Sequence, residues 1–188
     1  MKKQDTLLVI IAVLMIIGAA LSRVFFYPLN YSPVIAMALF GGSVISNKKL
    51  AFALPLFAML LADILFEVFN IATGFWGWGQ LIGYGIFAVI TLLGFRLKKI
   101  SVLNVAGFSV ISSLIFFFLS NSAFWLIDNR VYQLYTQDLT GYFNSLIGGL
   151  PFLEKGLFVD LAYSALFFGG YVLLQKFAVK RVGVVISN

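Results

Sequence analysis

The feature that most constrains this chain is a series of apolar runs, joined by short polar segments and repeated along the whole sequence. Of its 188 residues, 62% are hydrophobic and only 11% are charged, whereas about 25% of the residues of a soluble domain are charged. An apolar run of about 20 residues is long enough to cross the hydrocarbon core of a bilayer. The sequence therefore predicts an all-α integral membrane protein, with residues 1–188 forming a single transmembrane domain.

The predicted fold is a bundle of six spans, at residues 6–22, 34–46, 50–69, 80–95, 101–125 and 156–176. The second span is short, because at 1.5 Å per residue it covers only about 20 Å. We therefore expect the preceding residues to enter the membrane with it. Pro33 suits the first turn of a helix, and Ser32 is predicted to cap that helix. Gly41 and Gly42 either allow a close helix approach or end the helix.

The basic residues are divided unevenly between the two sides of this bundle. One side carries ten of them: Lys2, Lys3, Lys48, Lys49, Arg96, Lys98, Lys99, Lys176, Lys180 and Arg181. The other side carries only Arg23, Arg130 and Lys155. The positive-inside rule then predicts a multi-pass protein of the bacterial plasma (inner) membrane with both termini in the cytoplasm. The net charge of +6 thus reflects topology, and no nucleic-acid partner is expected.

The aromatic residues favour the opposite, outer side. Trp76, Trp78 and Trp125 all fall there, together with most of the tyrosines. The outer connections, at 23–33, 70–79 and 127–155, are also predicted to be the longer ones. Either the rings form an interfacial belt, or they line a cavity that opens outward, with residues 23–33 as a lid.

Several polar residues are predicted to lie within the outer third of the spans. Asp63 and Glu67 are one helical turn apart, so their carboxylates share a face. Asp160 is expected one turn inside the last span, with Tyr163 close behind it, and Asn121 near the outer end of the fifth span. Ionisable residues inside a membrane are functional candidates by default. The alternative for Asp63 is an ion pair with Arg23, or a cap for a loop backbone, and the two roles are compatible.

The sequence gives little support to catalysis. It contains no cysteine and no histidine, which removes thiolate nucleophiles, imidazole acid–base chemistry and the common nitrogen and sulfur metal ligands. The two carboxylates at 63 and 67 lie on one helix and do not face each other across a scissile bond. We therefore expect a protein that is not an enzyme and that has no metal site and no cofactor.

Four stretches carry a family resemblance: N-Y-S-P-V-I-A-M-A-L-F-G-G (30–42), P-L-F-A-M-L-L-A-D (55–63), S-N-S-A-F-W (120–125) and P-F-L-E-K-G-L-F-V-D-L-A-Y-S-A-L-F-F-G-G (151–170). They resemble a family of small bacterial membrane proteins related to the substrate-binding S-components of energy-coupling-factor (ECF) vitamin transporters. The resemblance implies a protein that captures a vitamin-like molecule from outside. It would then associate with an ECF coupling subunit and its ATPases, and topple in the membrane to release the cargo.

The chain departs from those transporters in two places. S-components present an Ala-x-x-x-Ala pattern on the first span to dock the coupling subunit, whereas this chain has Ala12 and Ile16. A related cobalamin-transport branch places a cysteine on the metal of its ligand, and this chain has none. Corrinoid binding would here proceed without that bond.

The leading hypothesis is capture of a micronutrient such as cobalamin or another planar vitamin from the outer face. The aromatic rings would stack on the ligand and the polar groups would orient it. The candidate substrate-binding residues are Arg23, Asn30, Ser32, Asp63, Trp76, Trp78, Asn121, Trp125, Asp160 and Tyr163. The alternative is a non-transporting accessory or structural subunit of a membrane complex, which predicts no ligand-sized outer cavity. A membrane enzyme acting on a lipid is a third and weaker reading.

Overall fold

The structure is a computed structural model that describes residues 3–25, 32–75 and 77–186, with side chains at 6–25, 32–75 and 77–177. Every regular element in this part of the chain is helical, as predicted. The elements are α1 (Lys3–Phe25), α2 (Val34–Val44), α3 (Lys48–Val68), α4 (Trp78–Gly94), α5 (Val102–Ala123), the π-helical turn η2 (Phe124–Asp128), α6 (Asn129–Tyr132) and α7 (Leu139–Ile186).

Four helical stretches among the described residues are long and apolar enough to cross a membrane. They are Thr6–Phe25, Lys48–Val68, Val102–Tyr132 and Leu139–Phe177. The third of these runs through α5, η2 and α6 without a break. Helices α2 and α4 are apolar but shorter. These lengths and compositions are compatible with a membrane location.

The short helix α2 lies at the centre of the bundle. It contacts α1, α3, α4, α5 and α7, and most of its residues are buried. A helix that is apolar on all sides suits such a position, because it has no polar face to present to water. Phe40 in its middle contacts the rings of Phe167, Phe168 and Tyr171, with centroids 5.3–5.6 Å apart. These rings join α2 to the second half of α7.

Glycines allow α2 to approach its neighbours closely. A Cβ atom on Gly42 would lie 2.2 Å from the backbone oxygen of Thr91, and one on Gly94 would lie 2.5 Å from that of Leu39. Gly41 likewise leaves room for the ring of Pro55, which is buried within α3. Of the two roles predicted for Gly41 and Gly42, the structure therefore shows close approach.

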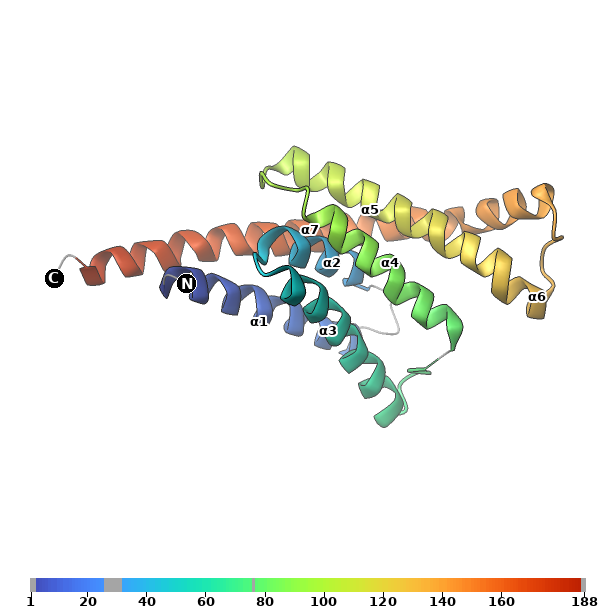
Figure 1. Cartoon of the computed structure of the whole chain (residues 1–188), viewed down its shortest axis with the longest axis horizontal. Coiled ribbons are helices and arrows are strands. Elements are labelled where there is room, and N and C mark those ends of the chain that lie inside the picture. The colour runs from blue at the N-terminus through green and yellow to red at the C-terminus, as the bar shows by residue number, and fades with distance from the viewer. Residues whose placement is uncertain (1–2, 26–31, 76, 187–188) are drawn as a thin grey trace.

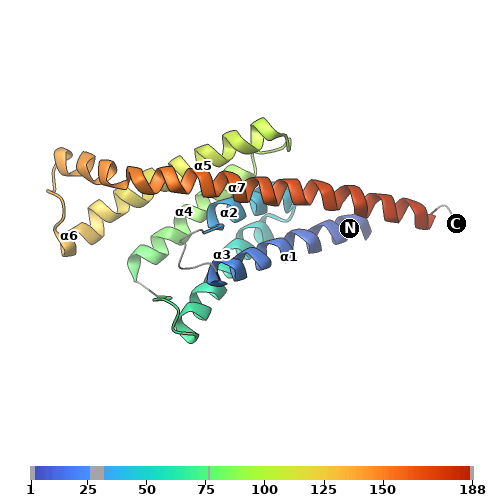
Figure 2. The same cartoon turned by 180° about the vertical axis from the view of Figure 1, so that it is seen from behind.

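The longest helix, α7, runs the length of the molecule beside α5 and α1 (Figures 1 and 2). Both chain ends lie at one end of the bundle, and the α2–α3 and α4–α5 turns face the same way (Figure 1). Lys98 and Lys99 lie in the α4–α5 turn, and Lys48 and Lys49 begin α3 directly after the α2–α3 turn. The α3–α4 connection and α6 lie toward the opposite end (Figure 1).

Two local predictions are wrong. The segment predicted as an outer loop at 127–155 is mostly helical, because α7 begins at Leu139 and not near residue 156. Glycine and proline are common in loops, but packed membrane helices tolerate both. Ser32 does not cap α2: Pro33 occupies the cap position and no side chain bonds there.

Candidate functional site

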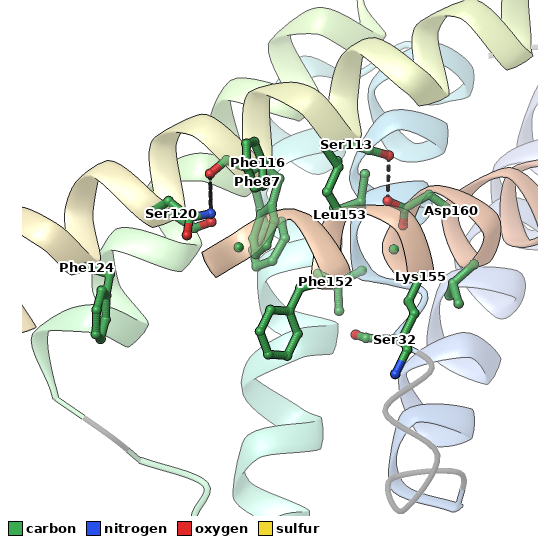
Figure 3. A pocket seen from close by; sticks show the side chains of 17 residues that line it. Ser32, Phe87, Ser113, Phe116, Ser120, Phe124, Phe152, Leu153, Lys155 and Asp160 are labelled. Atoms are coloured by element: carbon green, nitrogen blue, oxygen red, sulfur yellow. Dashed lines mark hydrogen bonds between the residues drawn. The ribbon is translucent and has the colours of Figure 1, made fainter. Parts of the chain in front are cut away.

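A cavity of about 570 Å³ lies between α5 and α7, against α2 and α4. Its walls are largely apolar and include the aromatic side chains of Phe87, Phe116, Phe117, Phe124 and Phe152. Phe87 and Phe116 stack with centroids 5.6 Å apart. The polar side chains that also line it are Ser32, Ser113, Ser120, Asn121, Lys155 and Asp160 (Figure 3). An apolar pocket of this size with a few converging polar groups is the usual form of a small-molecule site.

Asp160 is the buried carboxyl group of this cavity, with only 3% of its surface exposed. Its Oδ2 accepts a 2.6 Å hydrogen bond from the Ser113 hydroxyl on α5 (Figure 3). Its other carboxylate oxygen accepts no hydrogen bond from the residues that the structure describes. One helical turn further along α7, Ser164 Oγ donates to Ser109 Oγ of α5 at 3.1 Å, so polar contacts between the two helices continue past Asp160.

The remaining polar groups lie around the aromatic walls. Lys155 is exposed and lies close to Ser32 (Figure 3). It forms no ion pair within the described part of the chain. Asn121 donates to the backbone oxygen of Phe117 at 2.8 Å. Gly149 of α7 faces it, and a Cβ there would lie 2.5 Å from Asn121 Oδ1.

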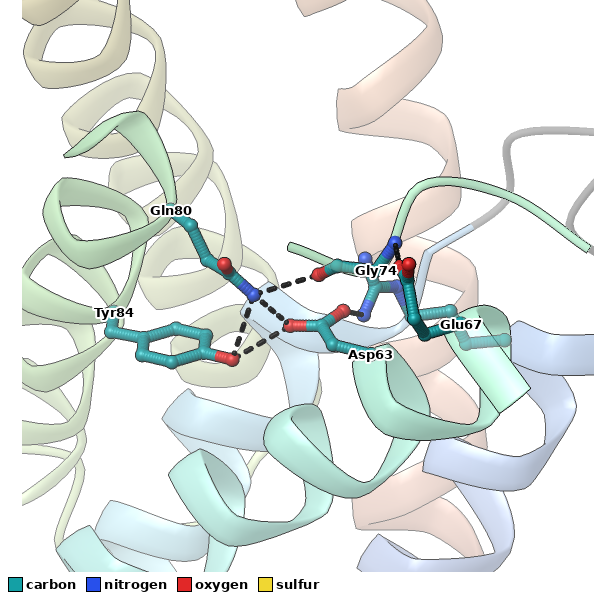
Figure 4. Close-up of polar contacts among 6 residues, drawn as sticks. Asp63, Glu67, Gly74, Gln80 and Tyr84 are labelled. Carbon is teal, nitrogen blue, oxygen red and sulfur yellow. Dashed lines mark hydrogen bonds and ion pairs between the residues drawn. The ribbon is translucent and has the colours of Figure 1, made fainter. Parts of the chain in front are cut away.

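A second polar cluster surrounds Asp63 on α3, which is only 1% exposed (Figure 4). Asp63 Oδ1 pairs with Arg23 of α1 at 2.5 Å. Asp63 Oδ2 accepts hydrogen bonds from Gln80 Nε2 at 2.8 Å and from the Tyr84 hydroxyl at 2.7 Å, both on α4. The ion pair with Arg23 that the sequence offered as an alternative is therefore present, and this carboxylate is fully used within the bundle.

The same cluster holds the connection between α3 and α4. Gln80 Nε2 also donates to the backbone oxygen of Gly74 at 2.9 Å, and the Gly74 N–H donates to Glu67 Oε2 at 2.9 Å (Figure 4). Gly74 is required there, because a Cβ would lie 2.0 Å from the backbone oxygen of Asp63. Asp63 and Arg23 thus join three helices and a loop, away from the residues that line the cavity.

Comparison with known protein families gives one match, which spans residues 2–182 and is described as "Family of unknown function (DUF6580)". The chain belongs to this family. Comparison with curated proteins gives no match, and comparison with solved structures gives none.

The candidate residues of this DUF6580 protein fall into separate groups. Ser32, Asn121 and Asp160 line the cavity, whereas Arg23 and Asp63 form the second cluster. Asn30 and Trp76 lie outside the described residues. The structure also places Asp160 near the middle of α7, and not one turn from its outer end as predicted.

The remaining candidates lie outside the cavity wall. Trp125 packs edge-on against Tyr142 at 5.4 Å, and its ring N–H donates to the backbone oxygen of Thr136 at 3.0 Å. Trp78 is the first residue of α4 and is 74% exposed. Tyr163 packs against the hydrophobic core. Trp125 and Tyr163 thus contribute to packing within the bundle, and Trp78 presents its ring on the surface.

Sequence reasoning missed the phenylalanines of the cavity and Lys155. The chain has 21 phenylalanines, and composition alone does not separate those facing a cavity from those facing lipid. One signal was present: Ser109, Ser113 and Ser120 recur at helical spacing along an otherwise apolar α5. Such a polar stripe marks the face turned toward α7 and the cavity.

Proposed function

We propose that this chain is a multi-pass protein of the bacterial plasma membrane that captures a vitamin-like small molecule, in the manner of an S-component. The observation that carries the proposal is the cavity between α5 and α7, which combines aromatic walls with converging polar groups and one buried carboxylate. Intramembrane ionisable residues that face a cavity mark ligand or ion pathways. The chemistry needed is recognition, so we propose no catalytic role and no cofactor.

The proposed orientation has both termini in the cytoplasm and the cavity turned outward. Lys98 and Lys99 precede the start of α5, whereas the cavity-lining residues of α5 lie in its second half, from Ser113 to Asn121, and are followed by Phe124 at the start of η2. The positive-inside rule places the lysines in the cytoplasm. The cavity then opens toward the outer face, from which a ligand would be captured.

The volume of the cavity limits the size of the ligand that it can enclose. About 570 Å³ lies within the range of pockets that enclose a drug-sized molecule, roughly 300–1,000 Å³. Cobalamin is much larger than a drug-sized molecule, so the volume favours a smaller vitamin-like ligand. Membrane lipid would surround the apolar side chains on the outside of the bundle.

An ECF coupling subunit with its ATPases is the partner that the resemblance proposes. Ala12 and Ile16 on α1 are both fully buried, so a coupling subunit would dock on another surface of the bundle. The accessory-subunit alternative predicts no ligand-sized cavity. The cavity therefore supports capture over that alternative.

The test is native mass spectrometry of the protein gently solubilised from its own host. Gly156 lines the cavity, and a Cβ there would meet no atom within 4 Å, so Gly156→Leu adds a side chain at the cavity wall without a backbone clash. Gly169 on the same helix is exposed and equally free of neighbours, so Gly169→Leu is the matched control. We expect a small molecule on the wild type and on Gly169→Leu, and its loss from Gly156→Leu.

Two results would count against capture. A wild-type chain that carries no small molecule but retains a stable protein partner without ATPases would favour the accessory-subunit role. A small molecule retained equally by Gly156→Leu and by the wild type would place the site outside this cavity.

A further inference from the structure

The end of the cavity next to Asp160 favours a positively charged group of a ligand over a negatively charged one. Asp160 is the only carboxylate among the described residues that line the cavity, and it is nearly fully buried. The Ser113 hydroxyl lies 2.6 Å from one of its oxygens and also 3.0 Å from the backbone oxygen of Ser109, and the other carboxyl oxygen has no described donor. A buried carboxylate with one hydrogen bond is costly unless it takes up a proton or pairs with a positive group, and a protonated nitrogen in a ligand would supply such a group.

The phenylalanine rings of the cavity wall also favour a positively charged group. Phe87, Phe116 and Phe117 line the cavity together with Asp160. The face of an aromatic ring is electronegative and attracts cations, more strongly in a desolvated site. A carboxylate beside phenylalanine rings therefore suits an organic cation. An anion at this end would be repelled by the carboxylate and by the ring faces. Among the described residues that line the cavity, Lys155 is the only cationic side chain that could offset this repulsion.

Lys155 does not reverse this preference, because it is exposed. Water screens an exposed ammonium group much more than a buried carboxylate. The two charges are five residues apart on α7, which is about 7.5 Å of rise. Lys155 is therefore a feature of the rim, and Asp160 is the charge that an enclosed ligand contacts.

Resting on the proposed function, we infer that the ligand carries a protonated nitrogen that binds Asp160, and an apolar body that lies against the phenylalanines. Ser113 and Asn121, at the two ends of this wall, are eight residues apart on α5, or about 12 Å along the helix. A ligand of that length would place its nitrogen at Asp160 and a hydrogen-bonding group near Asn121. The ligand class is thus an elongated, amine-bearing or similarly basic molecule of vitamin size.

The experiment uses the full-length protein in detergent, washed free of small molecules. The probe is a small-molecule extract of the host cells, divided on a strong cation exchanger at acidic pH. The retained fraction contains the basic molecules, and the flow-through contains neutral and purely anionic ones. The readout is the thermal unfolding midpoint of the protein in each fraction, followed by mass spectrometry of what it binds.

We expect only the retained fraction to raise the midpoint, and the bound molecule to contain a basic nitrogen. Asp160→Asn should lower the affinity by about tenfold or more, since it removes a buried charge partner. Asp160→Glu should retain part of the binding. Ser164→Ala, at the same helix interface but outside the lining residues, is the matched control and should bind like the wild type.

The outcomes separate the inference from the proposed function. Stabilisation by the flow-through alone, or a bound molecule without a basic nitrogen, overturns the inference and leaves capture standing. Unchanged binding by Asp160→Asn also overturns it and makes Asp160 a helix–helix contact. If Asp160→Asn does not fold, the two fractions tested on the wild type still decide, because the chemistry of the molecule that the wild type binds does not depend on any variant. No stabilisation by any fraction counts against capture itself.

Discussion

At the scale of single residues, the two carboxylates that are buried among the described side chains have opposite degrees of hydrogen-bond satisfaction. Asp63 receives three donors, from Arg23, Gln80 and Tyr84, whereas Asp160 receives one from Ser113. A carboxylate whose donors are all internal holds a structure together. One with a free oxygen facing a cavity is available to a ligand. The sequence grouped both as site residues, because their partners become apparent only when the helices are packed.

Replacement of Asp63 by Asn is expected to destabilise the fold by about 3 kcal/mol or more, because it leaves the Arg23 guanidinium without its partner in a largely buried place. Tyr84→Phe removes one hydrogen bond from the same carboxylate and should cost only about 1 kcal/mol. Unfolding in mixed micelles measures both. The folded fraction of each variant should still bind ligand. A loss of binding by a fully stable Asp63→Asn protein would instead make Asp63 part of the ligand site.

Asp138, immediately before α7, gives a pH-dependent prediction. The N–H of Gly141 and the hydroxyl of Thr136 both donate to its carboxylate at 2.7 Å. These bonds, the first above all, hold the pKa of Asp138 below its ordinary value. A lowered pKa means that this cap stabilises the start of α7 above the ordinary carboxyl pKa, and that the stabilisation is lost as the pH falls through the folded value.

Hydrogen exchange at Gly141, corrected for the intrinsic effect of pH, measures that loss. Protection should fall on acidification in the wild type, whereas Asp138→Asn should lack this titration. Equal pH dependence in the two proteins would show that another group controls the start of α7.

At the scale of elements, the sequence predicted the central helix better than the last one. The segment from Val34 to Gly42 is apolar on all sides and rich in small residues, which is typical of a fully enclosed helix. The start of α7 was missed because Gly148, Gly149 and Pro151 resemble loop residues. In the structure, Gly148 and Gly149 instead admit Tyr135 and Asn121 into close contact. Such contacts depend on which residues from distant segments face the glycines, and no local pattern contains that information.

The packing of α2 on α4 gives a matched pair of glycine substitutions. Gly42→Ala would place a Cβ 2.2 Å from the backbone oxygen of Thr91, so the helices must separate, at a cost of about 2–3 kcal/mol. Gly85→Ala on α4 meets nothing within 4 Å. It should be neutral or stabilise the protein by up to about 1 kcal/mol, since alanine favours helix. Thermal unfolding of the two variants checks this, and equal midpoints would show that the interface yields without strain.

At the scale of the whole molecule, the bundle is polarised. The start of α1, the end of α7 and the α2–α3 and α4–α5 turns face one end (Figure 1), with Lys48, Lys49, Lys98 and Lys99 in or beside those turns. The cavity residues of α5 lie in the half of that helix farther from Lys98 and Lys99. The charge pattern was readable from the sequence because the positive-inside rule depends only on the positions of basic residues. The position of the cavity was not, because it depends on the packing of α5, α7, α2 and α4 together.

This polarity is testable because the chain contains no cysteine, so single cysteines can be placed in a clean background. Ser46→Cys and Ile100→Cys, in or beside the two lysine turns, remove no charge. Leu134→Cys lies between α6 and α7 and is exposed. In intact cells a membrane-impermeant maleimide should label Leu134→Cys alone, and after permeabilisation it should label all three. The reverse pattern would turn the cavity toward the cytoplasm, and capture from the outer face would then be impossible for this fold.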